Sequence, residues 1–166
     1  AALHVGVPFL AVSPAYSLVS QDFGKLRAAI ALMTPGLVFA ADGGRYGRAI
    51  EATVPPDTEL AVTQAPPAGR RATSFEALAA TRDTAAVDAA HAAIGPETVT
   101  KFLLTSGSVG VPKAVIHTQR MLTANLQMIV DCLPFLSEEP PVLVDWLPWN
   151  HTFGGNHNFG LTPYNG

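Results

Sequence analysis

The sequence predicts an α/β fold in which a largely parallel sheet is flanked by helices. Short apolar runs rich in β-branched and aromatic residues alternate with segments whose apolar residues recur every three or four positions. This alternation is typical of parallel sheets, because parallel strands need a crossover connection that is usually a helix. The chain has 166 residues, of which 48% are hydrophobic, and it is long enough to bury a core. We therefore exclude disorder as its main state.

The first part of the chain predicts the order strand, helix, strand, helix, strand. Ser20 is expected to cap the first helix, and Pro35 lies just beyond its end. The apolar stripe of this helix is Phe23, Leu26, Ile30 and Met33. The expected elements are a strand at 5–12, a helix after Ser20, a strand at 36–41, a short helix at 43–52 and a strand at 59–63.

The middle segment, at about 53–97, is expected to be peripheral. Four prolines lie between Pro55 and Arg71, and the alanine-rich stretch at 77–93 carries little large apolar surface. After Thr98 alanine becomes scarce, and Gly, Ser, Thr, Trp, His and Asn become frequent. We therefore expect the functional residues after position 100.

Charge and cysteine content exclude several classes of protein. Ten Lys and Arg against 13 Asp and Glu give a net charge of -3, which provides no basic excess for a nucleic-acid partner. The single Cys132 cannot form an internal disulfide, which favours a reducing, cytoplasmic location. The first apolar run lacks a basic segment and is interrupted by Pro8 and Pro14, so we expect neither a signal peptide nor a membrane span.

The ends suggest part of a larger domain. The chain begins at Ala1 within an apolar run, and no Lys or Arg follows Arg120. A long stretch without basic residues is typical of a surface that other sequence covers. We expect residues 1–166 to form a fragment of one domain.

The first informative motif is KFLLTSGSVGVPKAVIHT, at 101–118. It predicts a strand at 101–106, a glycine-rich loop and a second strand at 113–117. Glycines let backbone N–H groups approach a phosphate, hydroxyls donate further hydrogen bonds, and a lysine supplies positive charge. The candidate phosphate-binding residues are Thr105, Ser106, Gly107, Ser108, Gly110 and Lys113.

The spacing of this loop differs from that of the Walker loop. The Walker loop has four residues between its glycines and then Gly-Lys-Ser/Thr, whereas Ala114 follows Lys113 here. A hairpin turn that merely needs glycine remains an alternative interpretation.

The second informative motif is PPVLVDWLPWNHTFGGNHNFG, at 140–160. We expect a buried strand at 142–147, with Trp146 in the core, and ligand contacts at its carboxyl end, where open α/β sheets bind ligands. The candidate substrate-binding residues are Trp149, Asn150, His151, Phe153 and Gly154. Two histidines six positions apart could suggest a metal site, but no carboxylate or cysteine lies between them, so we assign His157 a structural role and expect no metal ligand.

The two motifs together resemble the adenylate-forming superfamily of acyl-CoA synthetases. LLTSGSVGVPKAV resembles its phosphate-binding signature, and LPWNHTFGG resembles a downstream substrate-side motif. Further similarity in SPAYSLVSQDFGKLR, TPGLVFA, KAVIHTQRMLTANLQM and VDWLPWNHTFGGNHNFG points to the feruloyl-CoA synthase branch. The resemblance implies part of an N-terminal adenylation domain, with the carboxyl-terminal lid domain outside these residues.

The resemblance also implies a two-step ligase. A carboxylate such as ferulate attacks the α-phosphate of ATP to give an acyl adenylate and pyrophosphate, and the thiol of coenzyme A then displaces AMP. Lys113 would offset phosphate charge, and His151 would lie where the carboxylate and the thiol meet. Trp149 and Phe153 would offer flat apolar surface to an aromatic acid. Mg²⁺ is implied as well, although its family ligand has no counterpart in these residues.

Departures from the family pattern leave alternatives open. Val109 stands where the family usually has threonine, and Ala114 where it usually has glycine, so one hydroxyl donor is missing. Pro163 is expected to interrupt a helix. Because the family's later catalytic elements are absent, the fragment alone should not catalyse, and a non-catalytic nucleotide- or acyl-binding relative remains possible. A second alternative is an NAD-dependent oxidoreductase, because Gly43, Gly44 and Gly47 follow a predicted strand, although their spacing is not GxGxxG.

Overall fold

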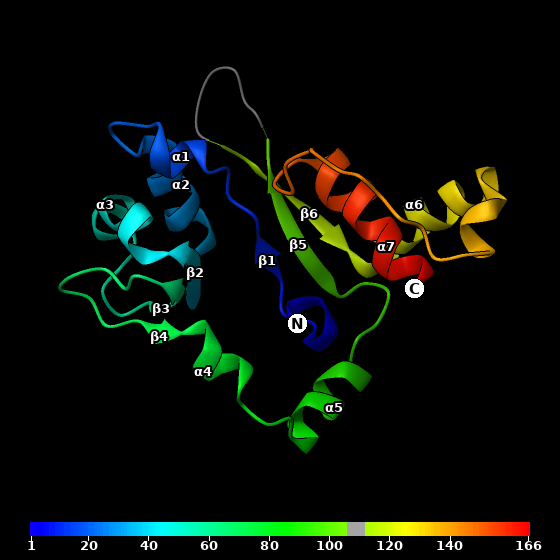
Figure 1. Ribbon diagram of the computed structural model, residues 1–166, viewed down its shortest axis with the longest axis horizontal. Helices are drawn as coiled ribbons and strands as arrows, with labels where there is room; N and C mark the ends of the chain where they lie inside the picture. Colours follow the sequence, from blue (N-terminus) through cyan, green and yellow to red (C-terminus); the bar gives the residue numbers. More distant parts are fainter. Residues whose placement is uncertain (106–111) are drawn as a thin grey trace. The chain divides into compact units, whose positions relative to one another are not determined.

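The computed structural model describes residues 1–105 and 112–166, which form two compact units. Unit 1 comprises residues 1–11, 84–105 and 113–166, and unit 2 comprises residues 12–83 together with Pro112. Figure 1 shows the helices and strands of each unit. Each unit contains a three-stranded sheet accompanied by helices, so the predicted α/β class is confirmed.

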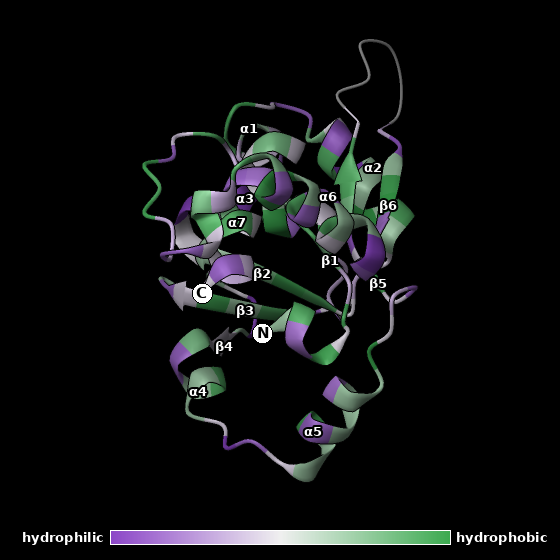
Figure 2. Cartoon of the chain, turned by 90° about the vertical axis from the view of Figure 1, so that its right-hand side faces the viewer, coloured by the Kyte–Doolittle hydropathy of each residue, from purple (hydrophilic) through white to green (hydrophobic). Residues whose placement is uncertain are grey.

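Unit 2 contains a parallel sheet in the order β2-β3-β4. Its strands are β2 (Leu37–Asp42), β3 (Glu59–Gln64) and β4 (Thr73–Ser74), and its helices are α1 (Ala15–Leu18), α2 (Gly24–Met33), α3 (Gly43–Thr53) and α4 (Phe75–Ala79). The predicted strands and helices at 36–63 are therefore confirmed, with ends shifted by about one residue. The strands β2 and β3 are strongly hydrophobic in Figure 2.

The core of unit 2 lies between α3 and β3. Ile50 of α3 and Val54, which follows α3, pack against Leu60 and Val62 of β3, and all four side chains are buried. A second cluster joins Phe23, Leu26 and Ala49. Leu26 and Ile30 of the predicted apolar stripe take part in these contacts, because residues three or four apart on a helix share one face.

Side-chain caps fix where the helices of unit 2 begin. The Asp42 carboxylate accepts a hydrogen bond from Arg45 N at 2.8 Å and caps α3. This bond and a second one from Gln64 lower the pKa of Asp42. Ser20 Oγ accepts from Phe23 N at 3.0 Å, as the predicted cap requires, but Phe23 has φ 54° and precedes the helix rather than belonging to it.

Unit 1 contains a mixed sheet in the order β1-β5-β6. Its strands are β1 (Phe9–Leu10), β5 (Val99–Leu104) and β6 (Ala114–Thr118), with β1 parallel and β6 antiparallel to β5. The predicted strand at 5–12 is wrong except at Phe9–Leu10. Residues Ala2–Val5 form the short 3-10 helix η1, Gly6 ends it at φ 68°, and Pro8 has no N–H to donate to a neighbouring strand.

The helices of unit 1 bury a small apolar cluster. They are α5 (Ala85–Ala92), α6 (Gln119–Cys132), the short helix η2 (Pro134–Ser137), the π-helix η3 (Phe153–Asn158) and α7 (Phe159–Asn165). Leu126 and Val130 of α6 pack against Leu136 and Leu161, so α6 and α7 lie side by side (Figure 1). None of the helices described at 1–105 and 112–166 is long and apolar enough to cross a membrane.

Pro163 lies inside α7, so the predicted interruption of that helix is wrong. The proline removes one backbone bond, the one that its N–H would give to the carbonyl of Phe159. Asn165 Nδ2 donates to the Leu161 carbonyl at 2.8 Å and helps to hold the last turn. A short helix thus tolerates the proline near its end.

Burial is uneven in the segment predicted to be peripheral. Leu60, Ala61 and Val62 of β3 are among the most buried residues of unit 2. By contrast, α4 and α5 contain no buried residue. The two histidines His4 and His91 stack with ring centroids 4.2 Å apart, and this contact joins α5 to η1.

We predict that Gly43→Ala destabilises the protein whereas Gly36→Ala does not. A Cβ at position 43 would lie 2.6 Å from the Ala65 carbonyl oxygen, while one at position 36 would meet nothing within 4 Å. Overpacking of this kind costs about 1–3 kcal/mol. Urea unfolding of the two variants and the unmodified protein measures the difference. Equal unfolding midpoints for both variants would contradict the described packing of α3.

Candidate functional site

The hairpin β5–β6 brings two of the predicted phosphate-binding residues together. Thr105 N donates to the Lys113 carbonyl at 2.9 Å, and Lys113 N donates to Thr105 Oγ1 at 3.4 Å. Both residues are exposed. The predicted antiparallel strands on either side of the loop are confirmed by the register Leu104↔Ala114. The other candidates of the loop, Ser106, Gly107, Ser108 and Gly110, lie outside the described residues.

The buried strand predicted at 142–147 is wrong. These residues form neither helix nor strand, and Val142 and Val144 are 95% and 101% exposed. The side chain of Trp146 is 87% exposed, so its predicted place in the core is wrong as well. A short apolar run has the side-chain character of a buried strand, but a strand forms only when a neighbour accepts and donates its backbone hydrogen bonds. No strand of the described residues pairs with this run.

The residues after this run form a compact turn that carries the predicted substrate-binding residues. We call residues 148–155 the substrate-side turn. His151 N donates to the Pro148 carbonyl at 3.0 Å, and Gly155 N donates to the His151 carbonyl at 2.8 Å. The Nδ1 atom of His151 accepts from Phe153 N at 3.4 Å, and the ring is exposed. Asn150 is half-buried in the same turn.

Two aromatic side chains of the substrate-side turn are exposed. The ring of Trp149 lies 4.6 Å from that of Phe159, and the ring of Phe153 lies 4.7 Å from that of His157. Each is thus held by one aromatic neighbour and still offers apolar surface to solvent. The turn therefore presents an imidazole together with two flat apolar groups.

Backbone packing explains the two glycines of the motif. A Cβ at Gly154 would lie 2.6 Å from the Pro148 carbonyl oxygen, and one at Gly155 would overlap the Trp149 carbonyl oxygen. Both glycines are buried. Only glycine lets the start of η3 approach the backbone of 147–149 so closely. This close packing explains why position 154 is a glycine.

Sequence reasoning missed Lys101, which connects the sheet to the substrate-side turn. Its Nζ donates to the Gly155 carbonyl at 2.9 Å and lies 5.8 Å from the ring centroid of Phe9. The residue is only 4% exposed, and burial lowers the pKa of the Lys101 amine. A signal was present in the sequence, because a lysine at a buried position of an apolar strand is rare unless it has a partner.

Asp145 and Asn158 are a second missed pair. Asp145 Oδ1 accepts from Leu147 N and from Asn158 Nδ2, each at 2.9 Å. These two bonds lower the pKa of Asp145. His157 Nδ1 lies 2.8 Å from Asn158 Oδ1, which agrees with the structural role assigned to His157. The amide and the carboxylate thereby link η3 to the exposed segment before the turn.

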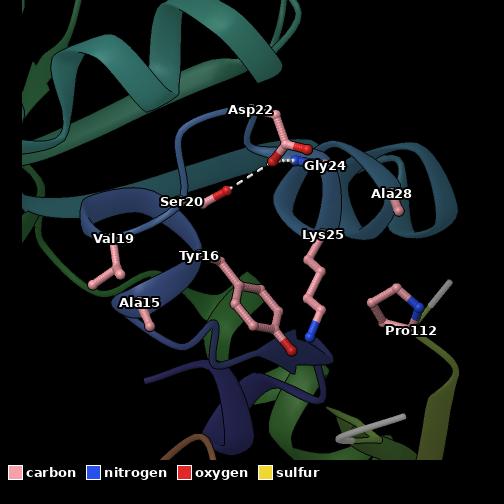
Figure 3. A pocket seen from close by; sticks show the side chains of 9 residues that line it. All are labelled: Ala15, Tyr16, Val19, Ser20, Asp22, Gly24, Lys25, Ala28 and Pro112. Carbon is pink, nitrogen blue, oxygen red and sulfur yellow. Dashed lines mark hydrogen bonds between the residues drawn. The ribbon is translucent and has the colours of Figure 1, made fainter. Parts of the chain in front are cut away.

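Unit 2 has two further candidate binding sites, the start of α3 and an open pocket. At the start of α3, the Asp42 carboxylate already caps the helix, and Gly43 abuts Ala65 and Pro67, so protein fills the place that a dinucleotide pyrophosphate would need. The open pocket is shown in Figure 3, where Lys25 Nζ lies 5.7 Å from the ring centroid of Tyr16.

Within 1–105 and 112–166, no three His, Cys, Asp or Glu side chains gather where they could hold a metal.

Comparison with known families decides the classification. The model of the family described as "AMP-binding enzyme" matches residues 1–165. The chain belongs to the AMP-binding enzyme family. This is the adenylate-forming family that the two motifs resemble, and its enzymes use ATP.

Solved structures with a similar fold include VinN, ATP-bound MatB and an adenylation domain. VinN is 22% identical, with a TM-score of 0.63 over 97% of this chain and 36% of its own. ATP-bound MatB from Rhodopseudomonas palustris is 21% identical, with a TM-score of 0.65 over 99% of this chain and 30% of its own. The adenylation domain of a keto acid-selecting NRPS module, bound to a keto acyl adenylate, is 25% identical, with a TM-score of 0.64 over 96% of this chain and 26% of its own. This AMP-binding chain therefore spans about a third or less of the solved proteins that it matches.

We predict that Lys101 makes the stability of this AMP-binding chain depend on pH in the alkaline range. Its pKa is lower in the folded protein than the usual 10.5, so between the two values the unfolded chain holds a proton that the folded chain lacks. Stability must then rise with pH in that window. We expect the free energy of unfolding of the unmodified protein, minus that of Lys101→Met, to increase as the pH rises toward 10.5.

Urea unfolding of both proteins at several alkaline pH values measures this difference. Subtracting the variant cancels the titration of groups that the two proteins share. A difference that stays constant or falls with pH would show that the Lys101 amine is not buried as described.

Proposed function

We propose that this AMP-binding protein is an acid–thiol ligase of the feruloyl-CoA synthase type, which activates an aromatic carboxylate with ATP and transfers the acyl group to coenzyme A. The observation that carries the proposal lies within unit 1. The hairpin β5–β6 ends at the hydrogen-bonded pair Thr105 and Lys113. Lys101 of the same hairpin binds the turn that carries His151. Two residues of the proposed phosphate-binding motif, Thr105 and Lys113, thus belong to the same compact unit as an exposed imidazole.

In the first step, a carboxylate oxygen of the acid forms a bond to the α-phosphorus of ATP, and the bond to pyrophosphate breaks. Negative charge grows on the departing phosphates. The exposed Lys113 ammonium and the hydroxyl of Thr105 are suited to stabilise that charge, together with the loop donors Ser106 and Ser108. The proposed role of these residues is therefore positioning and electrostatic stabilisation.

In the second step, the thiol of coenzyme A gives its proton to solvent, its sulfur forms a bond to the acyl carbon, and AMP leaves with the electrons of the broken C–O bond. We assign His151 to the place where the carboxylate and the thiol meet, because its ring is exposed on the substrate-side turn. Exposed Trp149 and Phe153 would contact the aromatic ring of the acid, and Asn150 and Gly154 complete the proposed substrate side.

Mg²⁺ accompanies ATP in the proposed reaction, where it would neutralise phosphate charge. No three metal-ligating side chains gather among the described residues, and the acidic residue that the family uses for magnesium has no counterpart in this sequence. We therefore assign no magnesium ligand to 1–105 and 112–166.

The proposal places residues 1–166 within one adenylation domain that also needs further elements, including the lid domain of the family. Two observations support this arrangement. The chain spans 36%, 30% and 26% of the three solved proteins compared above. The segment around Val142 and Val144 exposes apolar side chains that lack a covering partner among the described residues. The proposed location is the cytoplasm, where the single exposed Cys132 would stay reduced.

The test is pyrophosphate release by the full-length protein with ATP, Mg²⁺ and ferulate. We expect Lys113→Ala and Ser106→Ala to lower the rate about tenfold each, because a hydrogen bond to a charged group is worth about 1.5–3 kcal/mol. Val109→Thr should raise the rate, because threonine has nearly the shape of valine and adds the missing donor. Matched controls are Arg82→Ala and Val7→Thr, which change exposed residues away from both motifs.

Two results would contradict the proposal. The loop does not handle phosphate if Lys113→Ala loses nothing and Val109→Thr gains nothing. The protein is a non-catalytic relative if it binds ATP and ferulate but releases no pyrophosphate.

The acid specificity is tested with three acids. Ferulate should support pyrophosphate release, whereas L-aspartate and an aliphatic keto acid, the kinds of acid found with VinN and the NRPS domain, should support at least about tenfold less. Equal rates with all three would contradict an aromatic acid pocket. Trp149→Ala should lower the rate with ferulate more than the background rate with the other two acids.

A further inference from the structure

Lys101 occupies a place that an apolar side chain would ordinarily take. Lys101 and Leu103 point to the same face of β5, because side chains alternate along a strand, and each is 4% exposed. Thr105 continues the same alternation at the end of the strand. Burying an ammonium costs free energy unless a partner compensates, so the position is not explained by core packing alone.

The partner of Lys101 is the backbone of the substrate-side turn. The Gly155 carbonyl accepts from Lys101 Nζ at 2.9 Å, while the Gly155 amide donates to the His151 carbonyl at 2.8 Å. Gly155 is therefore held on one side by the strand and on the other by His151. The Trp149 carbonyl oxygen also lies so close to Gly155 that a Cβ added there would overlap it.

These contacts form a short chain between two parts of the proposed site. One end is β5, which leads through Thr105 into the phosphate-binding motif. The other end is the His151 backbone, whose ring nitrogen is itself oriented by Phe153 N at 3.4 Å. The link consists of two hydrogen bonds through one glycine.

We propose that Lys101 is a positioning residue for adenylate formation, which holds Gly155 and so fixes His151 relative to the strand that leads to Thr105. The proposal rests on the proposed function of the substrate-side turn. Lys101 does not touch the reacting atoms. It acts through Gly155, and its effect on the reaction therefore depends on the presence of the His151 ring.

A double-mutant cycle in the full-length enzyme tests this dependence. Lys101→Met removes the donor and keeps an unbranched apolar chain, and His151→Ala removes the imidazole. We expect Lys101→Met to lower kcat for ferulate-dependent pyrophosphate release about tenfold, with the KM for ATP changed less than about twofold. In the His151→Ala background, the same change should lower kcat by less than about twofold.

Two further variants separate positioning from general loss of structure. Lys101→Arg keeps a cation and a donor, and it should recover at least about half of the lost kcat. Arg82→Met removes an exposed cation from the loop between α4 and α5, and it should leave kcat unchanged. Full additivity of Lys101→Met and His151→Ala would overturn the proposal, and so would an equal loss in Lys101→Arg and Lys101→Met.

Hydrogen–deuterium exchange tests the same contact without any turnover. Loss of the Lys101 bond should free Gly155, so peptides covering 150–158 should exchange at least about tenfold faster in Lys101→Met than in the unmodified protein. Arg82→Met should show no change there. Unchanged exchange in Lys101→Met would overturn the positioning role whatever the kinetics.

The two arms distinguish this proposal from the proposed function. If the unmodified enzyme releases no pyrophosphate with ferulate, the proposed function fails, and exchange over 150–158 alone decides whether Lys101 holds the turn. If ferulate is activated but both arms show no effect of Lys101→Met, the function stands and the positioning role is overturned.

Discussion

The close approach of Gly154 and Gly155 to the backbone of 147–149 is the constraint on which the proposed site depends. A Cβ at either glycine would overlap or crowd a carbonyl oxygen, so the turn exists in this form only with two glycines. Once the turn is closed, the Gly155 carbonyl faces the sheet and accepts from Lys101 Nζ, and the Gly155 amide holds the His151 carbonyl. Backbone contacts rather than side-chain packing thus determine where the imidazole lies.

The candidate site residues of unit 1 are different from the residues of its apolar cluster. Leu126, Val130, Leu136 and Leu161 form its apolar cluster, and the candidate site residues Thr105, Lys113 and His151 are exposed. Lys101 belongs to neither group, because it is buried and charged. Burying a charge costs desolvation free energy. A buried charge is therefore best explained if it specifies one arrangement of the chain. The proposed positioning role gives that specificity a purpose in catalysis.

Periodicity predicted much of unit 2, because the pattern there records contacts that the folded chain makes. Leu26 of the predicted apolar stripe is buried in α2, and Asp42 caps the helix that follows its strand. The strand predicted at 142–147 failed, because a short apolar run reports side-chain character but not whether a neighbouring strand is present to pair with it. It missed Lys101 for the opposite reason. A hydrophobicity pattern treats a lysine as exposed. Only the folded chain shows the Gly155 carbonyl that accepts a hydrogen bond from Lys101 Nζ. The motifs at 101–118 and 140–160 identified the candidate residues, but the hydrogen bonds that connect the two motifs were visible only in the structure.

We propose that the end of the β5–β6 hairpin at Thr105 and Lys113 binds ATP and that the substrate-side turn binds the carboxylic acid of the same reaction. A crystal structure of the full-length protein with ferulate, Mg²⁺ and α,β-methylene ATP, which cannot release pyrophosphate, tests that claim most directly. The account predicts the β- and γ-phosphates within hydrogen-bond distance of Thr105 or Lys113, and the ferulate carboxylate beside His151 with its ring against Trp149 or Phe153. Phosphates bound away from the β5–β6 hairpin, or ferulate bound away from 148–155, would contradict it.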